Sequence, residues 1–194
     1  MTTTPGTDPR PLYTRATAQA AELIRTVRPE QLTAPTPCTE WDVRRLLSHI
    51  VGATRRISVV GEGGEGMAVP LFADDITDGA WAQAYDEVRA RAVKAWESDA
   101  RMAASVRVPW GEITGQAALS AYVVEIVVHT WDLSEALGHP LALDPELAEF
   151  ALPVAREAVP AGPREDRPFG PEVPSPEGAD IYGQLAGWLG RRPL

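Results

Sequence analysis

Apolar residues recur every three to four positions in several segments of this chain, which is the spacing that one face of an α-helix requires. The first such segment, 11–28, opens with a proline, a residue favoured in the first helical turn, and Pro29 stops it. A second helix is expected to begin at Thr39, because Thr39-x-x-Asp42 resembles a capping box, and its apolar face runs on to Ile57. The start of the chain therefore predicts two amphipathic helices joined by a proline-rich connector.

The middle of the chain continues the helical pattern. Asp78 resembles an N-cap for a third helix, whose apolar face ends near Trp96. Thr114 can cap a fourth helix, which is apolar on nearly every side and which Gly138 ends. A shorter fifth helix is predicted over 144–159, with an Asp-Pro pair in its cap and first-turn positions.

The remaining segments are rich in turn-forming residues. The glycine-rich stretch 61–66 ends the second helix and opens a loop, and 103–111 is expected to be short and extended or turn-like. No segment alternates apolar and polar residues over any length, so no strand is predicted. Six prolines between Pro160 and Pro176 exclude a helix there, and 181–189 is expected to form a last helical turn or two.

These elements predict an all-α protein: a four-helix bundle with an additional short helix and a proline-rich C-terminal tail. We expect residues 1–10 to be a disordered N-terminal tail, 11–160 to form the helical bundle, and 161–194 to be an extension that packs on the bundle. Such a proline-rich extension is stiff enough to wall a pocket and too irregular to build its own core.

The composition is that of a globular protein in water, with 44% hydrophobic and 23% charged residues. A net charge of −9 argues against a nucleic-acid partner, which selects basic surfaces, and against anionic membranes. No apolar run approaches the ~20 residues of a membrane-spanning helix, and the first residues lack the pattern of a secretory signal. The single cysteine excludes an internal disulfide, so the expected location is the cytoplasm, and a homodimer is compatible with the sequence.

Three polar residues interrupt the apolar fourth helix, namely Glu125, His129 and Asp132. Their spacings of four and three place them within roughly 60° of one another on the helix surface. A helix this apolar is normally buried, and a buried carboxylate beside a buried imidazole needs compensation. A divalent metal supplies it, because Glu oxygen and His nitrogen are both good ligands. A buried Glu–His hydrogen bond without metal is the alternative.

His49 strengthens the metal hypothesis, because Glu125 and His129 would need a third ligand. It lies in the second helix among apolar neighbours, where a lone histidine is usually a satisfied core residue. The remaining histidine, His139, sits between Gly and Pro just past a helix end and is expected to be exposed. Two histidines and one carboxylate from two facing helices would form a three-ligand site with an open position, as in catalytic metal sites.

Four further residues are candidates for roles around such a site. Asp132 could orient the neighbouring imidazole or pair with an arginine. Arg45, one turn before the histidine of the second helix, could reach an anionic substrate or be solvated, and Trp110, in a Pro-Trp-Gly turn, is a candidate pocket wall. Cys38 could be a nucleophile, although a small buried residue is the commoner role. No residue is assigned a catalytic role, because no Ser-His-Asp order suggests a triad.

Two segments resemble those of a known family. Residues 37–52, PCTEWDVRRLLSHIVG, resemble the pattern P-C-x-x-W-x-V-x-x-L-x-x-H-x-x-G, and residues 122–138, YVVEIVVHTWDLSEALG, resemble a helix with E-x-x-x-H-x-W-D. Both are similar to the N-terminal domain of mycothiol-dependent maleylpyruvate isomerase, within the DinB-like metalloprotein superfamily. The stretch 169–193 resembles the tail of a single-domain, metal-binding subgroup.

The resemblance implies a DinB-like four-helix bundle in which His49, Glu125 and His129 bind a divalent metal. Zinc suits two histidines and a glutamate best, with nickel, iron or manganese as alternatives, and a low-molecular-weight thiol of the mycothiol type is the implied cosubstrate. The two-domain isomerase uses a separate C-terminal domain at its active site, for which about 35 residues after the last clear helix are too few. We therefore expect a thiol-dependent transferase or isomerase acting on a small molecule. The alternatives are a non-catalytic metal- or ligand-binding protein and a metal-dependent hydrolase.

Overall fold

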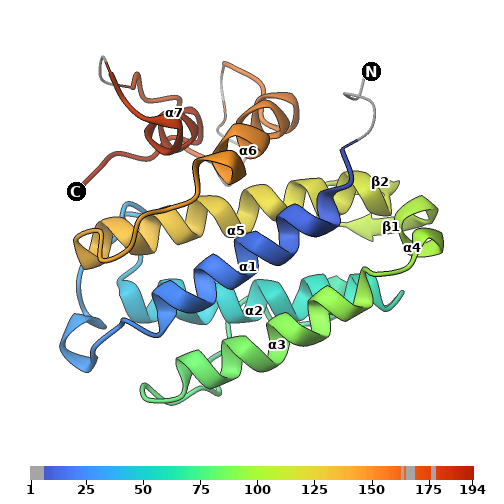
Figure 1. The fold of residues 1–194 in the computed structure, drawn as a ribbon, viewed down its shortest axis with the longest axis horizontal. Helices are drawn as coiled ribbons and strands as arrows, with labels where there is room; N and C mark the ends of the chain where they lie inside the picture. Colours follow the sequence, from blue (N-terminus) through green and yellow to red (C-terminus); the bar gives the residue numbers. More distant parts are fainter. Residues whose placement is uncertain (1–6, 163, 165–168, 176–177) are drawn as a thin grey trace.

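A computed structural model describes residues 7–162, 164, 169–175 and 178–194 of the chain. Four long helices run side by side in a bundle, and two further helices lie against one side of it, next to the longest helix (Figure 1). The bundle consists of α1 (Pro9–Ile24), α2 (Val43–Gly61), α3 (Trp81–Ala95) and α5 (Gly115–Leu137). The added helices are α6 (Pro145–Ala158) and α7 (Ile181–Trp188). The expected all-α class and four-helix bundle are therefore confirmed.

Several predicted helix ends are also confirmed, because their capping residues act as the sequence suggests. The Thr114 side chain accepts a hydrogen bond from a backbone N–H in the first turn of α5, and Gly138 ends that helix with φ of 73°. Asp144 caps α6 in the same way, directly before a proline. α7 extends the predicted last turn or two over eight residues.

Other predicted boundaries are wrong. The second helix does not begin at Thr39: its N-cap is Asp42, whose carboxylate accepts a hydrogen bond from the Arg45 N–H. Asp78 does not cap the third helix, which begins at Trp81. Its carboxylate instead accepts a hydrogen bond from Arg44 Nε at 2.8 Å, so a long-range ion pair replaces the expected cap. α1 begins at Pro9 because Asp8 caps it, two residues earlier than predicted.

The absence of strands is a further prediction that the structure corrects. Between the short helix α4 (Asp99–Ala103) and α5, an antiparallel hairpin forms from β1 (Ser105–Val108) and β2 (Gly111–Thr114). Val106 pairs with Ile113 in its register. The extended or turn-like segment expected over 103–111 contains β1 and the hairpin turn. Strands of four residues are too short to establish an alternating pattern, which explains why the sequence did not reveal the pairing.

The C-terminal part of the chain contacts the bundle through α7. The Tyr182 hydroxyl donates a hydrogen bond to the Asp144 carbonyl at 3.0 Å and accepts one from Gln19 of α1 at 2.9 Å. Trp188 Nε1 donates to the Val159 carbonyl at 3.0 Å, which ties α7 to the end of α6. The expected disordered tail lies outside the described residues up to residue 6, whereas Arg10 belongs to α1. Within the described ranges, no helix combines the length and apolar character needed to cross a membrane.

Candidate metal centre

Helices α2 and α5 bring the three predicted ligands together. His49 lies on the buried face of α2, and Glu125 and His129 lie one turn apart on the facing side of α5. Glu125 Oε1 is 2.8 Å from His49 Nε2 and 3.5 Å from His129 Nε2. The three ligand atoms all lie within 4.8 Å of one another. Residues separated by 76 positions in sequence thus converge on one point.

This donor set fits a divalent metal. With bonds of about 2.0–2.2 Å, neighbouring ligand atoms of a tetrahedral ion lie roughly 3.3–3.6 Å apart. The Glu125–His129 separation of 3.5 Å falls in this range, and the Glu125–His49 contact of 2.8 Å is shorter. Both histidine side chains are only 6% exposed, whereas that of Glu125 is 29% exposed, so solvent approaches the three ligands from the glutamate side. The 2.8 Å contact also satisfies the metal-free alternative, a His49–Glu125 hydrogen bond, and the experiments below separate the two.

The electrostatics of the three groups are strongly coupled. Burial by itself would raise the pKa of Glu125, but the charge and hydrogen bonds of the two imidazoles outweigh burial and hold this pKa well below its ordinary range. Burial lowers the pKa of His49 by more than its hydrogen bond to Glu125 raises it. For His129 burial acts in the same direction, but the Glu125 charge and the Asp132 hydrogen bond outweigh it, and the pKa is raised well above its usual value. A metal at this site would therefore displace a proton from His129.

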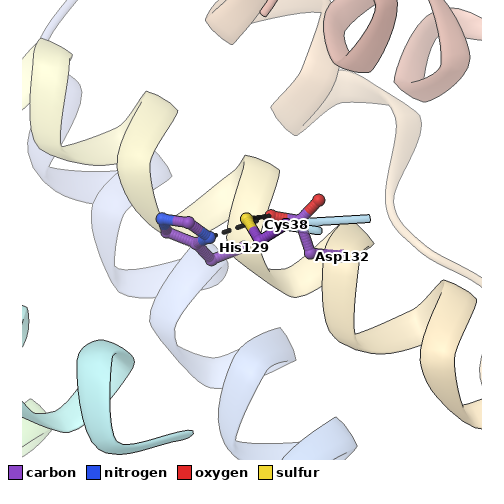
Figure 2. Close-up of side chains that lie close together, drawn as sticks. All are labelled: Cys38, His129 and Asp132. Atoms are coloured by element: carbon purple, nitrogen blue, oxygen red, sulfur yellow. Dashed lines mark hydrogen bonds and ion pairs between the residues drawn. The ribbon is translucent and has the colours of Figure 1, made fainter. Parts of the chain in front are cut away.

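Asp132 holds the second nitrogen of His129. The His129 Nδ1–H donates to Asp132 Oδ2 at 2.9 Å, and the Cys38 thiol donates to the same oxygen at 3.2 Å (Figure 2). This contact points Nε2 of the ring toward Glu125, and in the neutral imidazole it leaves Nε2 with the lone pair that a metal ligand needs. Cys38 is partly buried in the turn before α2. Its hydrogen bond to Asp132 places it beside the three candidate ligands.

His49 is held by aromatic packing. Its ring stacks on Trp41 with centroids 4.7 Å apart and on Phe72 with centroids 5.6 Å apart. Trp41 also contacts His129, at 5.8 Å between centroids. Among the described residues, His49 Nδ1 has no hydrogen-bond partner. The sequence did not reveal that Trp41 and Phe72 support His49. Phe72 belongs to a loop without periodicity, whereas the tryptophan of the P-C-x-x-W pattern is a signal that could have revealed Trp41.

Two candidate residues lie away from the three ligands. Arg45 forms an ion pair with Asp74 at 3.0 Å and stacks on the Phe72 ring at 3.3 Å, so its charge is paired and one aromatic side chain lies between it and His49. Trp110 is 57% exposed in the hairpin turn and contacts Tyr122. A groove of about 820 Å³ lies at the N-terminal end of α2 and is lined by none of the three candidate ligands. Arg45 lines this groove, and Trp110 does not.

Trp41 connects this groove with the candidate metal centre, because it lines the groove and also packs against the His49 ring. The groove carries two further kinds of side chain, hydroxyl groups such as that of Ser48 and carboxylates such as that of Asp74. It is thus mixed in polarity and large enough for a small polar molecule.

Comparisons with known proteins agree with this architecture. Residues 13–134 match the model of the mycothiol maleylpyruvate isomerase N-terminal domain. The fold is similar to the crystal structure of the mycothiol-dependent maleylpyruvate isomerase, with a TM-score of 0.63, 13% identity, and coverage of 79% of this chain and 68% of that one. A mutant of that isomerase gives a TM-score of 0.64, at 14% identity and the same coverage.

Similarity extends along nearly the whole chain to two uncharacterized proteins of Mycobacterium tuberculosis, from strains CDC 1551 / Oshkosh and ATCC 25618 / H37Rv. Each is 35% identical over 187 residues, which covers 95% of this chain and 98% of the relative. The matched family region contains all three candidate ligands, the whole of segment 37–52 and residues 122–134 of segment 122–138. The chain therefore belongs to the family of the mycothiol maleylpyruvate isomerase N-terminal domain.

Proposed function

We propose that this protein binds one divalent metal through His49, Glu125 and His129 and uses it in a thiol-dependent transfer or isomerisation of a small molecule. The observation that carries the proposal is the convergence of three ligand atoms, within 4.8 Å of one another, from two helices. The buried residues that surround these ligands on the two helices are largely apolar. Zinc suits this donor set best, and nickel, iron and manganese are the alternatives to test.

The bound metal would supply one function, the stabilisation of a thiol sulfur as thiolate at neutral pH. The protein residues would do the rest. His129 is oriented by Asp132, Trp41 and Phe72 shield the His49 ring from water, and the exposed edge of Glu125 leaves an approach for a thiol. The groove beside Trp41 would accommodate the second substrate. Thiol dependence is supported by the mycothiol dependence of the structurally similar isomerase, and the protein is expected to work in the cytoplasm, where such thiols stay reduced.

The test begins with metal content. Protein purified without a histidine tag should contain close to one divalent metal per chain by elemental analysis, and the absence of stoichiometric metal would contradict the proposal. The native metal is then replaced by cobalt, and mycothiol or a simpler thiol is titrated in. A thiolate-to-cobalt charge-transfer band should appear.

The outcome of the titration distinguishes the functional classes. A thiol-dependent band that is absent in His49→Ala supports the proposed chemistry. If cobalt binds but thiols leave its spectrum unchanged while carboxylates change it, a metal-dependent hydrolase or a non-catalytic binding protein replaces the thiol enzyme. A turnover assay with thiol conjugates separates an enzyme from a binding protein.

A further inference from the structure

The turn that ends α7 places the side chain of Arg191 against the bundle. The N–H of Gly190 donates to the Gly187 carbonyl, and the N–H of Arg191 donates to the Ala186 carbonyl at 2.9 Å, the two hydrogen bonds of a Schellman motif. Gly190 has φ of +81°, and a Cβ there would lie 2.8 Å from the backbone of Gly170. Only glycine fits this turn without strain, and the turn places the next side chain against α5.

That side chain, Arg191, is buried beside the metal centre. It is 10% exposed, and its Nε lies 3.5 Å from Oδ2 of Asp132, which is fully buried. Its Nη2 lies 3.5 Å from Cys38 Sγ, and its Nη1 donates to the Leu189 carbonyl at 3.0 Å. A buried carboxylate is costly without a cation, so Arg191 supplies the countercharge that keeps Asp132 in the core.

Two hydrogen-bond donors, the imidazole N–H of His129 and the Cys38 thiol, therefore converge on one oxygen, Asp132 Oδ2. The guanidinium of Arg191 forms an ion pair with the same oxygen at 3.5 Å. Cys38, His129 and Asp132 could also be considered a second metal site, because their ligand atoms lie close together. The guanidinium contradicts that interpretation, since it places a positive charge beside two of the three groups and would repel a second cation.

We propose that Arg191 is a positioning residue of the metal centre, which acts through Asp132 to hold His129 in the orientation that binds metal. This inference rests on the proposed metal-binding function. A positioning role for Arg191 would make the C-terminal segment part of the site, because contacts from Arg191 to Asp132 and from Asp132 to His129 would link the docking of α7 to metal binding. By thermodynamic linkage, the metal should in turn stabilise the docked segment.

The central experiment measures zinc affinity by competition with a chelator in Arg191→Gln, Arg191→Lys and Arg192→Gln. Loss of an outer partner of a metal ligand typically costs about 10–100-fold in affinity, and Arg191→Gln should show a loss of this size. Arg191→Lys keeps the charge and should recover part of it. Arg192 is the matched control, because it is the adjacent arginine and is exposed, so Arg192→Gln should bind zinc like the wild type.

Two further measurements keep the test independent of simple misfolding. The visible spectrum of cobalt-loaded Arg191→Gln should shift relative to Arg192→Gln, because the His129 ligand is no longer held. Gly190→Ala retains every charge but disrupts the turn, and it should reproduce the loss of zinc affinity. In the wild-type protein, hydrogen exchange of 181–194 should slow when zinc is added.

The outcomes separate this inference from the proposed function. If the wild-type protein takes up no metal, the proposed function fails, and this inference fails with it. If the wild type binds zinc but Arg191→Gln matches Arg192→Gln in affinity and cobalt spectrum, the proposed function stands and the positioning role of Arg191 is wrong. Should Arg191→Gln not fold, hydrogen exchange of 181–194 in the wild type that is unaffected by zinc overturns the inference.

Discussion

Apart from their shared contact with Glu125, the two imidazoles of the candidate metal centre are held by different forces. On α5, His129 is fixed by a directional hydrogen bond to Asp132, a carboxylate that a thiol and a guanidinium also contact. On α2, His49 has no partner for its Nδ1 among the described residues and packs against two aromatic rings that also contact each other. One side of the site is therefore organised by charge and the other by packing.

This difference predicts which substitutions matter on each side. Hydrogen bonds to a buried carboxylate define both the tautomer and the direction of a ring, so their loss should act mainly on metal affinity. Aromatic packing restricts a ring without directing its nitrogen, so its loss should act mainly on stability.

Removal of either imidazole should have the largest effect. His129→Ala and His49→Ala each leave two of three ligands, and we expect each variant to lose stoichiometric metal, with affinity falling by more than ~100-fold, or about 2.7 kcal/mol. Elemental analysis after dialysis measures the loss. The control is His139→Ala, whose side chain is 61% exposed and pairs with Glu135 outside the centre. Full metal retention in His129→Ala would disprove the ligand assignment.

Asp132→Asn should have the next largest effect. Asparagine keeps an oxygen that can accept the His129 N–H but removes the charge opposite Arg191, so we expect zinc affinity to fall by about 10–100-fold. Competition with a chelator measures this change on protein whose helical circular dichroism is verified. Asp74→Asn is the control, because Asp74 is 76% exposed and its ion pair with Arg45 contacts none of the ligands. Equal affinities in the two variants would contradict the assignment of an orienting role to Asp132.

The parts of this molecule that the sequence predicts are those with strong local signals. Both ends of α5 follow from Thr114 and Gly138, because a side-chain cap and a left-handed glycine act within a few residues of the helix. The start of α2 was mispredicted because Thr39 and Asp42 both satisfy capping preferences. The choice depends on a backbone bridge between Pro35 and Asp42, which no local pattern reveals.

The same distinction holds for the site. His49, Glu125 and His129 stand out because polar residues in apolar helices violate the expected pattern. Phe72 and Arg191 do not, since one lies in a loop and the other follows a short helix in a proline-rich region, where aromatic and basic residues are unremarkable. Their positions depend on long-range packing of these segments against α2 and α5.

Gly52 is the residue through which the packing side of the site can be tested. It lies one turn after His49 on α2, and a Cβ at this position would stand 2.3 Å from the carbonyl oxygen of Leu71. The loop that passes so closely is anchored by a 3.0 Å hydrogen bond from the Ala73 N–H to the Ser48 carbonyl. It carries Phe72, which stacks on the His49 ring. The absence of a side chain at Gly52 thus allows the aromatic support of His49 to form.

We expect Gly52→Ala to destabilise the protein even though alanine is the better helix former. Helix propensity favours alanine by about 1 kcal/mol, whereas forcing an extra methyl into a packed site costs about 1–3 kcal/mol. The clash should prevail, because the nearest atom belongs to backbone that cannot rotate away. Urea unfolding should show a net loss of up to ~2 kcal/mol, while zinc affinity should fall by less than tenfold because all three ligands and the Asp132 contact remain.

Gly79→Ala is the matched control, since a Cβ there meets nothing within 4 Å, and its stability should stay close to that of the wild type. If Gly52→Ala instead lowers zinc affinity as much as Asp132→Asn, the loop directs the His49 nitrogen and does more than restrict the ring. The contrast between a charge-organised and a packing-organised side would then be wrong for α2. If Gly52→Ala stabilises the protein, the loop yields easily, and His49 must owe its position to Trp41 and to the bound metal.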